Sequence, residues 1–140
     1  MDSSDDFWIR AAIDLAQESR TPYGAIIVDP GDQYVSGYNT TIHDGATAHA
    51  EMNAIKKIAD LDYNTAEDLT IYTTVEPCPM CMSAIIWAGI GRVVYGASIE
   101  YAQQFGKQIK ISSKEVAEAS WYPIEITAGI EAKGCEMLFK

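Results

Sequence analysis

Apolar residues recur along this chain at two spacings, one typical of helices and one typical of strands. We expect the first helix to begin at an N-cap formed by Ser4 or Asp5. It should end at Thr21-Pro22, because the residue before a proline avoids helical backbone angles. Two strand-like segments follow, separated by the turn sequence Asp29-Pro30-Gly31-Asp32. This order predicts a helix and then an antiparallel hairpin with strands at residues 23–28 and 34–39.

The rest of the chain alternates between helical and strand patterns. Helices are expected at 48–59 with Thr47 as the N-cap, from Pro79 to Gly89, at 113–120 behind the capping box Ser112-Ser113-Lys114-Glu115, and at 131–139. Strands are expected at 69–75, 92–96 and 124–127. Strands joined through a helix usually run parallel, with helices on both faces of the sheet. We therefore expect an α/β fold, a three-layer α/β/α sandwich whose five-stranded mixed sheet has an antiparallel hairpin followed by parallel strands. No repeat or linker interrupts the sequence, so we expect one domain over residues 1–140.

Composition and charge narrow the classes of function. The 140 residues carry a net charge of −10, and so acidic a surface repels polyanions. The charge favours a small-molecule substrate and disfavours nucleic acid as a partner. The N-terminus is acidic and no long apolar run is present, so neither a signal peptide nor a membrane span is expected. Two of the three cysteines form a Cys-x-x-Cys, which in a cytoplasmic protein indicates metal or redox chemistry.

Two short motifs carry the candidate chemistry. His49-Ala50-Glu51 and Pro77-Cys78-Pro79-Met80-Cys81 each stand at the expected start of a helix. One imidazole and two thiolates are the three protein ligands typical of a catalytic zinc, and Glu51 is placed to move protons beside it. A redox Cys-x-x-Cys is the first alternative, and a structural zinc site completed by His43 is the second. Cys135 is expected to be a small buried apolar residue.

Together the two motifs resemble the zinc signature of the cytidine deaminase superfamily. The similarity continues through Pro22-Tyr23-Gly24-Ala25-Ile26, Gly37-Tyr38-Asn39 and residues 91–97, and is greatest to the branch that contains guanine deaminases and bacterial tRNA adenosine deaminases. The Cys-x-x-Cys and the acidic N-terminus indicate a cytoplasmic protein. The resemblance implies a cytidine deaminase-like fold, a homodimer, and one Zn²⁺ per chain bound by His49, Cys78 and Cys81. It also implies Glu51 as the catalytic proton shuttle, with Asn39 and the backbone at Ala50 contacting the base.

The resemblance leaves the substrate open. Trp87 matches a tryptophan of the guanine deaminases, so it is a candidate substrate contact, although packing in the core or at an interface would also explain it. The segment 105–109 lacks the aspartates of guanine deaminases, whereas 124–130 resembles the tRNA deaminases. We expect a zinc-dependent aminohydrolase that deaminates a free nucleobase or nucleoside, guanine-like or a related amino-substituted ring. The alternatives are a tRNA adenosine-to-inosine deaminase and a non-catalytic zinc-binding interaction module.

Overall fold

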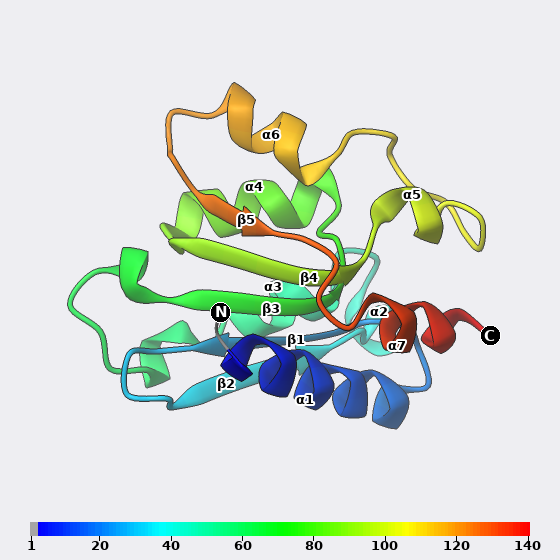
Figure 1. Ribbon diagram of the computed structural model, residues 1–140, viewed down its shortest axis with the longest axis horizontal. Helices are drawn as coiled ribbons and strands as arrows, with labels where there is room; N and C mark the ends of the chain where they lie inside the picture. Colours follow the sequence, from blue (N-terminus) through cyan, green and yellow to red (C-terminus); the bar gives the residue numbers. More distant parts are fainter. Residues whose placement is uncertain (1–2) are drawn as a thin grey trace.

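A computed structural model describes residues 3–140, which form a sheet with helices on both faces (Figure 1). Helix α1 (Ser3–Ser19) precedes the hairpin of β1 (Gly24–Val28) and β2 (Tyr34–Tyr38). The remaining elements, in chain order, are α2 (Thr41–Asp44), α3 (Ala50–Ile55), η1 (Ile58–Asp60), η2 (Ala66–Asp68), β3 (Thr70–Val75), α4 (Pro79–Ala88), β4 (Arg92–Ala97), α5 (Ile99–Ala102), α6 (Ser113–Ala119), β5 (Glu125–Thr127), α7 (Ala132–Glu136) and η3 (Met137–Phe139).

The strand order of the sheet is β2-β1-β3-β4-β5. Strand β1 pairs antiparallel with both β2 and β3, whereas β3 pairs parallel with β4 and β4 with β5. The predicted mixed sheet, with its hairpin followed by parallel strands, is confirmed. The last parallel pair follows from the connection through α6, which begins with the expected capping box between Ser112 and Glu115.

Two predicted helix starts are wrong. Helix α1 begins at Ser3, so Ser4 and Asp5 lie inside it rather than capping it. The Asp5 carboxylate is buried instead against Arg92, whose Nη1 and Nη2 donate to its two oxygens at 2.9 and 2.7 Å. Helix α3 begins at Ala50 with His49 as its N-cap, not at Ala48 behind Thr47. The Thr47 carbonyl oxygen accepts the N–H of His49 at 2.8 Å, and this tight turn delays the helix.

Other helix boundaries also differ from expectation. The helix predicted at 48–59 ends at Ile55 and is followed by the separate turn η1, and the closing helix divides into α7 and η3. The short helices α2 and α5 lie in segments for which no helix was predicted.

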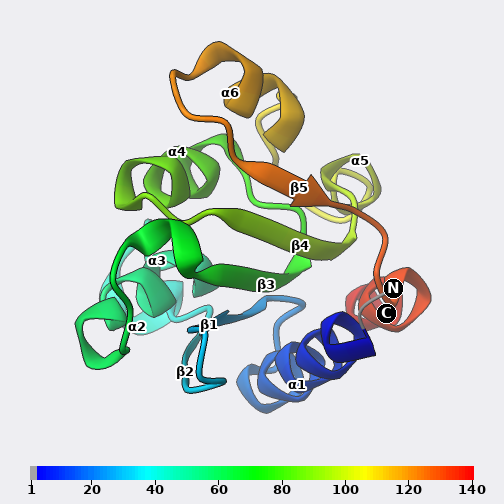
Figure 2. The same cartoon turned by 60° about the vertical axis from the view of Figure 1, so that its left-hand side comes forward.

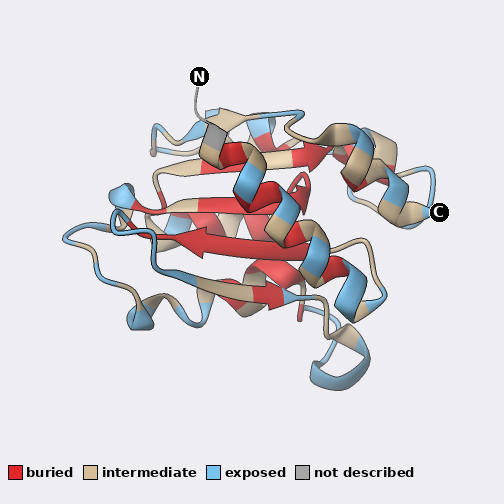
Figure 3. Cartoon of the chain, turned by 60° about the horizontal axis from the view of Figure 1, so that its bottom comes forward, coloured by how far each residue is buried: buried red, intermediate tan, exposed pale blue. Residues whose placement is uncertain are grey.

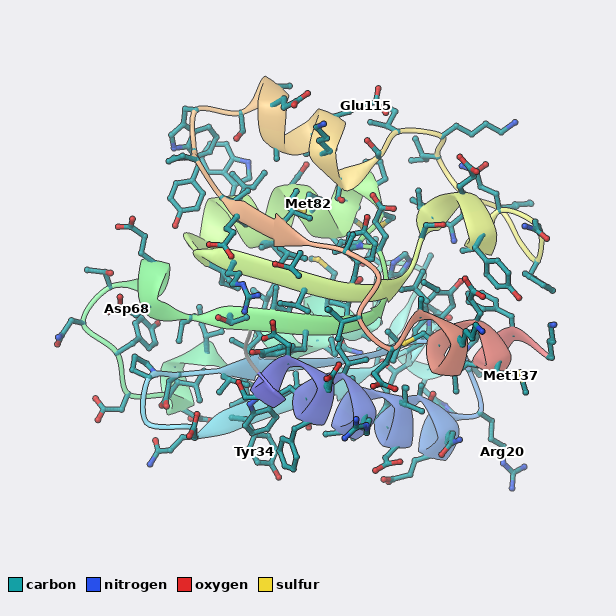
Figure 4. The ribbon with its side chains drawn as sticks, in the orientation of Figure 1. Arg20, Tyr34, Asp68, Met82, Glu115 and Met137 are labelled. Carbon is teal, nitrogen blue, oxygen red and sulfur yellow. The ribbon has the colours of Figure 1, made fainter. Side chains whose placement is uncertain are left out.

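The core consists of two apolar layers, one on each face of the sheet. Helices α1 and α7 cover one face, and α3 and α4 cover the other (Figure 2). The central strands β1, β3 and β4 are largely buried between these layers, as Figure 3 shows. Met82 of α4 lies fully buried beneath its helix (Figure 4). None of the helices within residues 3–140 has the length and apolar character needed to cross a membrane.

Candidate active site

The ends of several strands converge on one cavity. Strands β2 and β3 finish at this end of the sheet and β1 begins there, because β1 runs antiparallel to both neighbours. The cavity has a volume of about 150 Å³. Its walls come from residues that end or flank strands or lie at the starts of helices, together with two from the segment after α5: Tyr23, Asn39, His49, Glu51, Val75, Glu76, Cys78, Lys107 and Gln108. Ligands of open α/β sheets commonly bind beyond the strand ends in this way.

Two helix N-termini bring the predicted His/Cys/Cys group together. His49 is the N-cap of α3 and Cys78 the N-cap of α4, with Cys81 one turn further along α4. His49 Nδ1 lies 3.5 Å from Cys81 Sγ and 3.7 Å from Cys78 Sγ. The ligand atoms of the three side chains all lie within 4.8 Å of one another. The group could therefore surround a single metal ion.

These separations fit zinc. With Zn–S bonds of about 2.3 Å and Zn–N bonds of about 2.0 Å, tetrahedral coordination places nitrogen and sulfur about 3.5 Å apart. The two observed distances, 3.5 and 3.7 Å, are close to this value. Three protein ligands also leave a fourth position for water or substrate, as in catalytic rather than structural zinc sites.

The two thiols strongly affect each other's ionisation. A hydrogen bond with Cys81, supported by one with His49, lowers the pKa of Cys78 to about 4. The same contact between the sulfurs raises the pKa of Cys81, and burial raises it further. A hydrogen bond with Cys78 raises the pKa of His49. The thiols alone thus compete for one negative charge, whereas a metal ion stabilises both as thiolates.

Glu51 lies beside this group without belonging to it. It stands in the first turn of α3, two residues after His49, and its side chain lines the cavity. Burial raises the pKa of its carboxyl group to about 7. A carboxyl group in this position can exchange protons with a molecule held in the cavity.

Asn39 offers a hydrogen-bond donor to the cavity. It follows β2 directly, and its Oδ1 accepts both the backbone N–H and the hydroxyl of Thr41, at 3.0 and 2.9 Å. Because Oδ1 is engaged, the NH₂ group is what Asn39 can present to a bound ring. Ala50 lies between His49 and Glu51 with its methyl group in the core, so contact with a ring through its backbone stays a prediction.

Three residues singled out in the sequence lie away from the cavity. Trp87 is not among its lining residues: it lies on the outer face of α4, is 76% exposed, and packs against Trp121. His43 is exposed on α2 and does not join the His/Cys/Cys group, which argues against a four-ligand structural site. Cys135 is fully buried against Gly96, as expected for a small apolar residue.

The structure adds five cavity residues whose position the sequence did not predict. Val75 ends β3, and Tyr23 and Glu76 each stand next to a strand at the active-site end of the sheet, a placement that the strand boundaries alone could have indicated. Lys107 and Gln108 carried no such signal, because they lie in an irregular segment between α5 and α6.

Comparison with known proteins identifies the family. The model of the cytidine and deoxycytidylate deaminase zinc-binding region matches residues 2–97, which include the entire His/Cys/Cys group and Glu51. The chain belongs to this deaminase family.

Curated members of the family support the assignment over most of the chain. The probable cytosine deaminase of Schizosaccharomyces pombe is 36% identical over 133 residues, which cover 85% of this chain and 80% of that protein. The guanine deaminase of Bacillus subtilis is 36% identical over 116 residues, covering 78% and 74%. Hydrolytic deamination is therefore the activity of this deaminase.

A solved structure confirms the fold. The guanine deaminase of Nitrosomonas europaea superimposes with a TM-score of 0.82 at 21% identity, covering 96% of this chain and 81% of that one. At this level of identity the likeness establishes the shared deaminase fold and leaves the substrate open.

Proposed function

We propose that this deaminase acts on a free nucleobase or nucleoside, guanine-like or a related amino-substituted ring. The observation that carries the proposal is a small cavity in which the buried Glu51 stands beside the His49, Cys78 and Cys81 group. At about 150 Å³ the cavity is smaller than the ~300–1,000 Å³ of sites for drug-sized ligands, and it suits one ring system.

In this proposal His49, Cys78 and Cys81 hold one zinc ion. When bound, zinc supplies a nucleophile at neutral pH by lowering the pKa of water. Glu51 takes one proton of the attacking water and delivers it to the ring nitrogen. It then takes the second proton, from the hydroxyl formed on the ring carbon, and delivers it to the departing amine. A C–O bond forms as the C–N bond breaks, so the ring gains a carbonyl group and ammonia leaves. Asn39 donates its amide hydrogens to the ring and fixes its orientation.

The substrate class rests on charge and on the named relatives. The net charge of −10 disfavours binding of a polyanion. Two of the relatives are named as a probable cytosine deaminase and a guanine deaminase, and both names denote a free base as the substrate. Deamination of adenosine in tRNA is the competing function, because residues 124–130 resemble the tRNA deaminases.

Ammonia release tests the proposal. Purified, zinc-loaded protein is offered guanine, guanosine, cytosine, isocytosine, cytidine, adenine, adenosine and aminotriazines, with a tRNA substrate in parallel. Turnover of a free ring supports the proposal and names the substrate. Inosine appearing in tRNA while every free ring is inert would refute it in favour of the tRNA activity.

We also propose that the deaminase is a homodimer joined through the outer faces of α4 and α6. Trp87 and Trp121 are in contact there, with ring centroids 4.7 Å apart and ring planes tilted by 58°, and both are mostly exposed. The hollow that they line with Ile86 and Ile111 contains a single carboxylate, Glu115, so two acidic copies can meet with little repulsion. Sedimentation should show a dimer that Trp87→Ala shifts towards monomer. A wild-type monomer at micromolar concentration would refute this interface.

A further inference from the structure

Glu76 is a buried carboxylate that the deamination chemistry does not use. It follows β3, two residues before Cys78, and is 6% exposed. Its Oε1 accepts the backbone N–H of Ile99 at 3.0 Å. Its Oε2 accepts both the N–H and the hydroxyl of Ser113, at 2.8 and 2.7 Å. Hydrogen-bond donors of the protein therefore occupy both carboxylate oxygens. This favours a structural role for Glu76 over proton transfer or metal binding.

Besides Tyr95 of β4, the partners of Glu76 named above are the two ends of one stretch of chain. Ile99 begins α5 and Ser113 begins α6, so a single carboxylate ties both ends of segment 99–113 to the residue before Pro77-Cys78. This segment contains Lys107 and Gln108, which form one wall of the active-site cavity. Segment 99–113 thus meets the metal-binding turn through Glu76.

Apart from the ring contacts of Phe105 with Tyr101 and Phe139, few contacts hold the middle of this segment. Residues 104–107 and 109–111 are exposed, and the segment contributes no strand to the sheet. Gln108 reaches the rest of the cavity through one long contact, from its Nε2 to the Tyr23 hydroxyl at 3.5 Å. The buried hydrogen bonds to Glu76 fix both ends of the segment that carries this wall, which otherwise packs mainly through Phe105.

We propose that Glu76 is a positioning residue, which fixes segment 99–113 against the metal-binding turn so that Lys107 and Gln108 stand correctly for substrate recognition. The proposal rests on the cavity being the substrate site described above. A glutamine has the same size but presents an NH₂ group where an acceptor is needed, so Glu76→Gln should release one end of the segment. Ser113→Ala removes the hydroxyl donor and keeps the backbone N–H, so it should release the segment only in part.

A matched control lies on the same helix. Glu115 completes the capping box of α6, accepting the N–H of Ser112 at 2.9 Å, and it faces solvent (Figure 4). Glu115→Ala therefore weakens the start of α6 without changing any contact of Glu76. A general loosening of α6 would affect Glu76→Gln and Glu115→Ala alike. Under the proposal, only Glu76→Gln changes the position of Lys107 and Gln108.

The experiment compares the wild type with Glu76→Gln, Ser113→Ala and Glu115→Ala in three measurements: zinc per chain, amide hydrogen exchange of residues 99–113, and steady-state kinetics on whichever ring or tRNA the wild type deaminates. Glu76→Gln should keep its zinc, exchange faster over 99–113, and raise KM roughly tenfold with a smaller change in kcat. Ser113→Ala should show the same pattern more weakly, and it stands in should Glu76→Gln fail to fold. Glu115→Ala should leave KM unchanged.

Several results would overturn the proposal: unchanged exchange over 99–113 in both Glu76→Gln and Ser113→Ala, loss of kcat with KM unaltered, or an equal rise in KM in Glu115→Ala. Exchange and zinc content are measured without any substrate. They therefore decide the role of Glu76 even if no free ring is deaminated and the proposed substrate class fails.

Discussion

Replacing Gly37 by alanine tests how closely the active site depends on the contact between β2 and α3. A Cβ atom at Gly37 would lie 2.5 Å from the Ala50 carbonyl oxygen and 2.7 Å from the Ala54 backbone nitrogen. Both neighbours are backbone atoms of α3, so neither can rotate away as a side chain could. Restoring a van der Waals separation of about 3.5 Å requires β2 and α3 to move apart by about 1 Å.

Such a shift would reach the chemistry directly. Helix α3 carries His49 at its N-cap and Glu51 in its first turn, whereas Cys78 and Cys81 belong to α4. Moving α3 alone changes the distances from His49 to both sulfurs. Overpacking of this kind costs about 1–3 kcal/mol, which lowers the midpoint of thermal unfolding by roughly 3–10 °C. A displacement of about 1 Å in the site can lower kcat/KM by about 100-fold.

The control for this prediction is Gly31→Ala in the turn of the same hairpin. A Cβ atom there meets only Asp29 Oδ1, at 3.6 Å, which is an ordinary contact. Thermal unfolding followed by circular dichroism, zinc per chain and ammonia release are measured for both variants. Gly37→Ala should unfold earlier, bind zinc more weakly and turn over more slowly, while Gly31→Ala should match the wild type. If the two variants were indistinguishable in unfolding and in zinc content, the close packing of α3 on β2 would not control the site.

Three further substitutions test individual roles. Glu51→Gln should keep zinc and lose turnover by about 10²–10⁴-fold, because it removes the proton shuttle; an active, zinc-loaded variant would remove Glu51 from the mechanism. Cys81→Ala should lose zinc and unfold at a lower temperature, whereas Cys135→Ala, the matched cysteine outside the site, should lose stability only. Full zinc occupancy in Cys81→Ala would contradict the ligand assignment. Asn39→Ala should raise KM about tenfold or more, since it deletes a donor to the ring, and unchanged kinetics on the true substrate would exclude that contact.

The overall fold could be predicted because its strongest signals are local. The turn at Asp29-Pro30-Gly31-Asp32 makes the hairpin, and Gly89 ends α4 in the left-handed conformation with φ of 82°. The helix starts at Ser4 or Asp5 and at Thr47 were wrong for a different reason. A capping residue is decided by competing hydrogen bonds, and Asp5 has a distant partner in Arg92 that no local pattern reveals.

The sequence by itself determined the chemical groups of the site. Cys78 and Cys81 lie within one turn of α4, and His49 and Glu51 lie within one turn of α3. Their proximity can therefore be predicted from their spacing in the sequence. Only the tertiary structure decided which distant residues join them. It brings Lys107 and Gln108 to the cavity and leaves Trp87 on an outer face. The physical reason is that contacts between residues far apart in the sequence depend on strand order and helix packing. Several elements must therefore be positioned together before the surroundings of one side chain are defined.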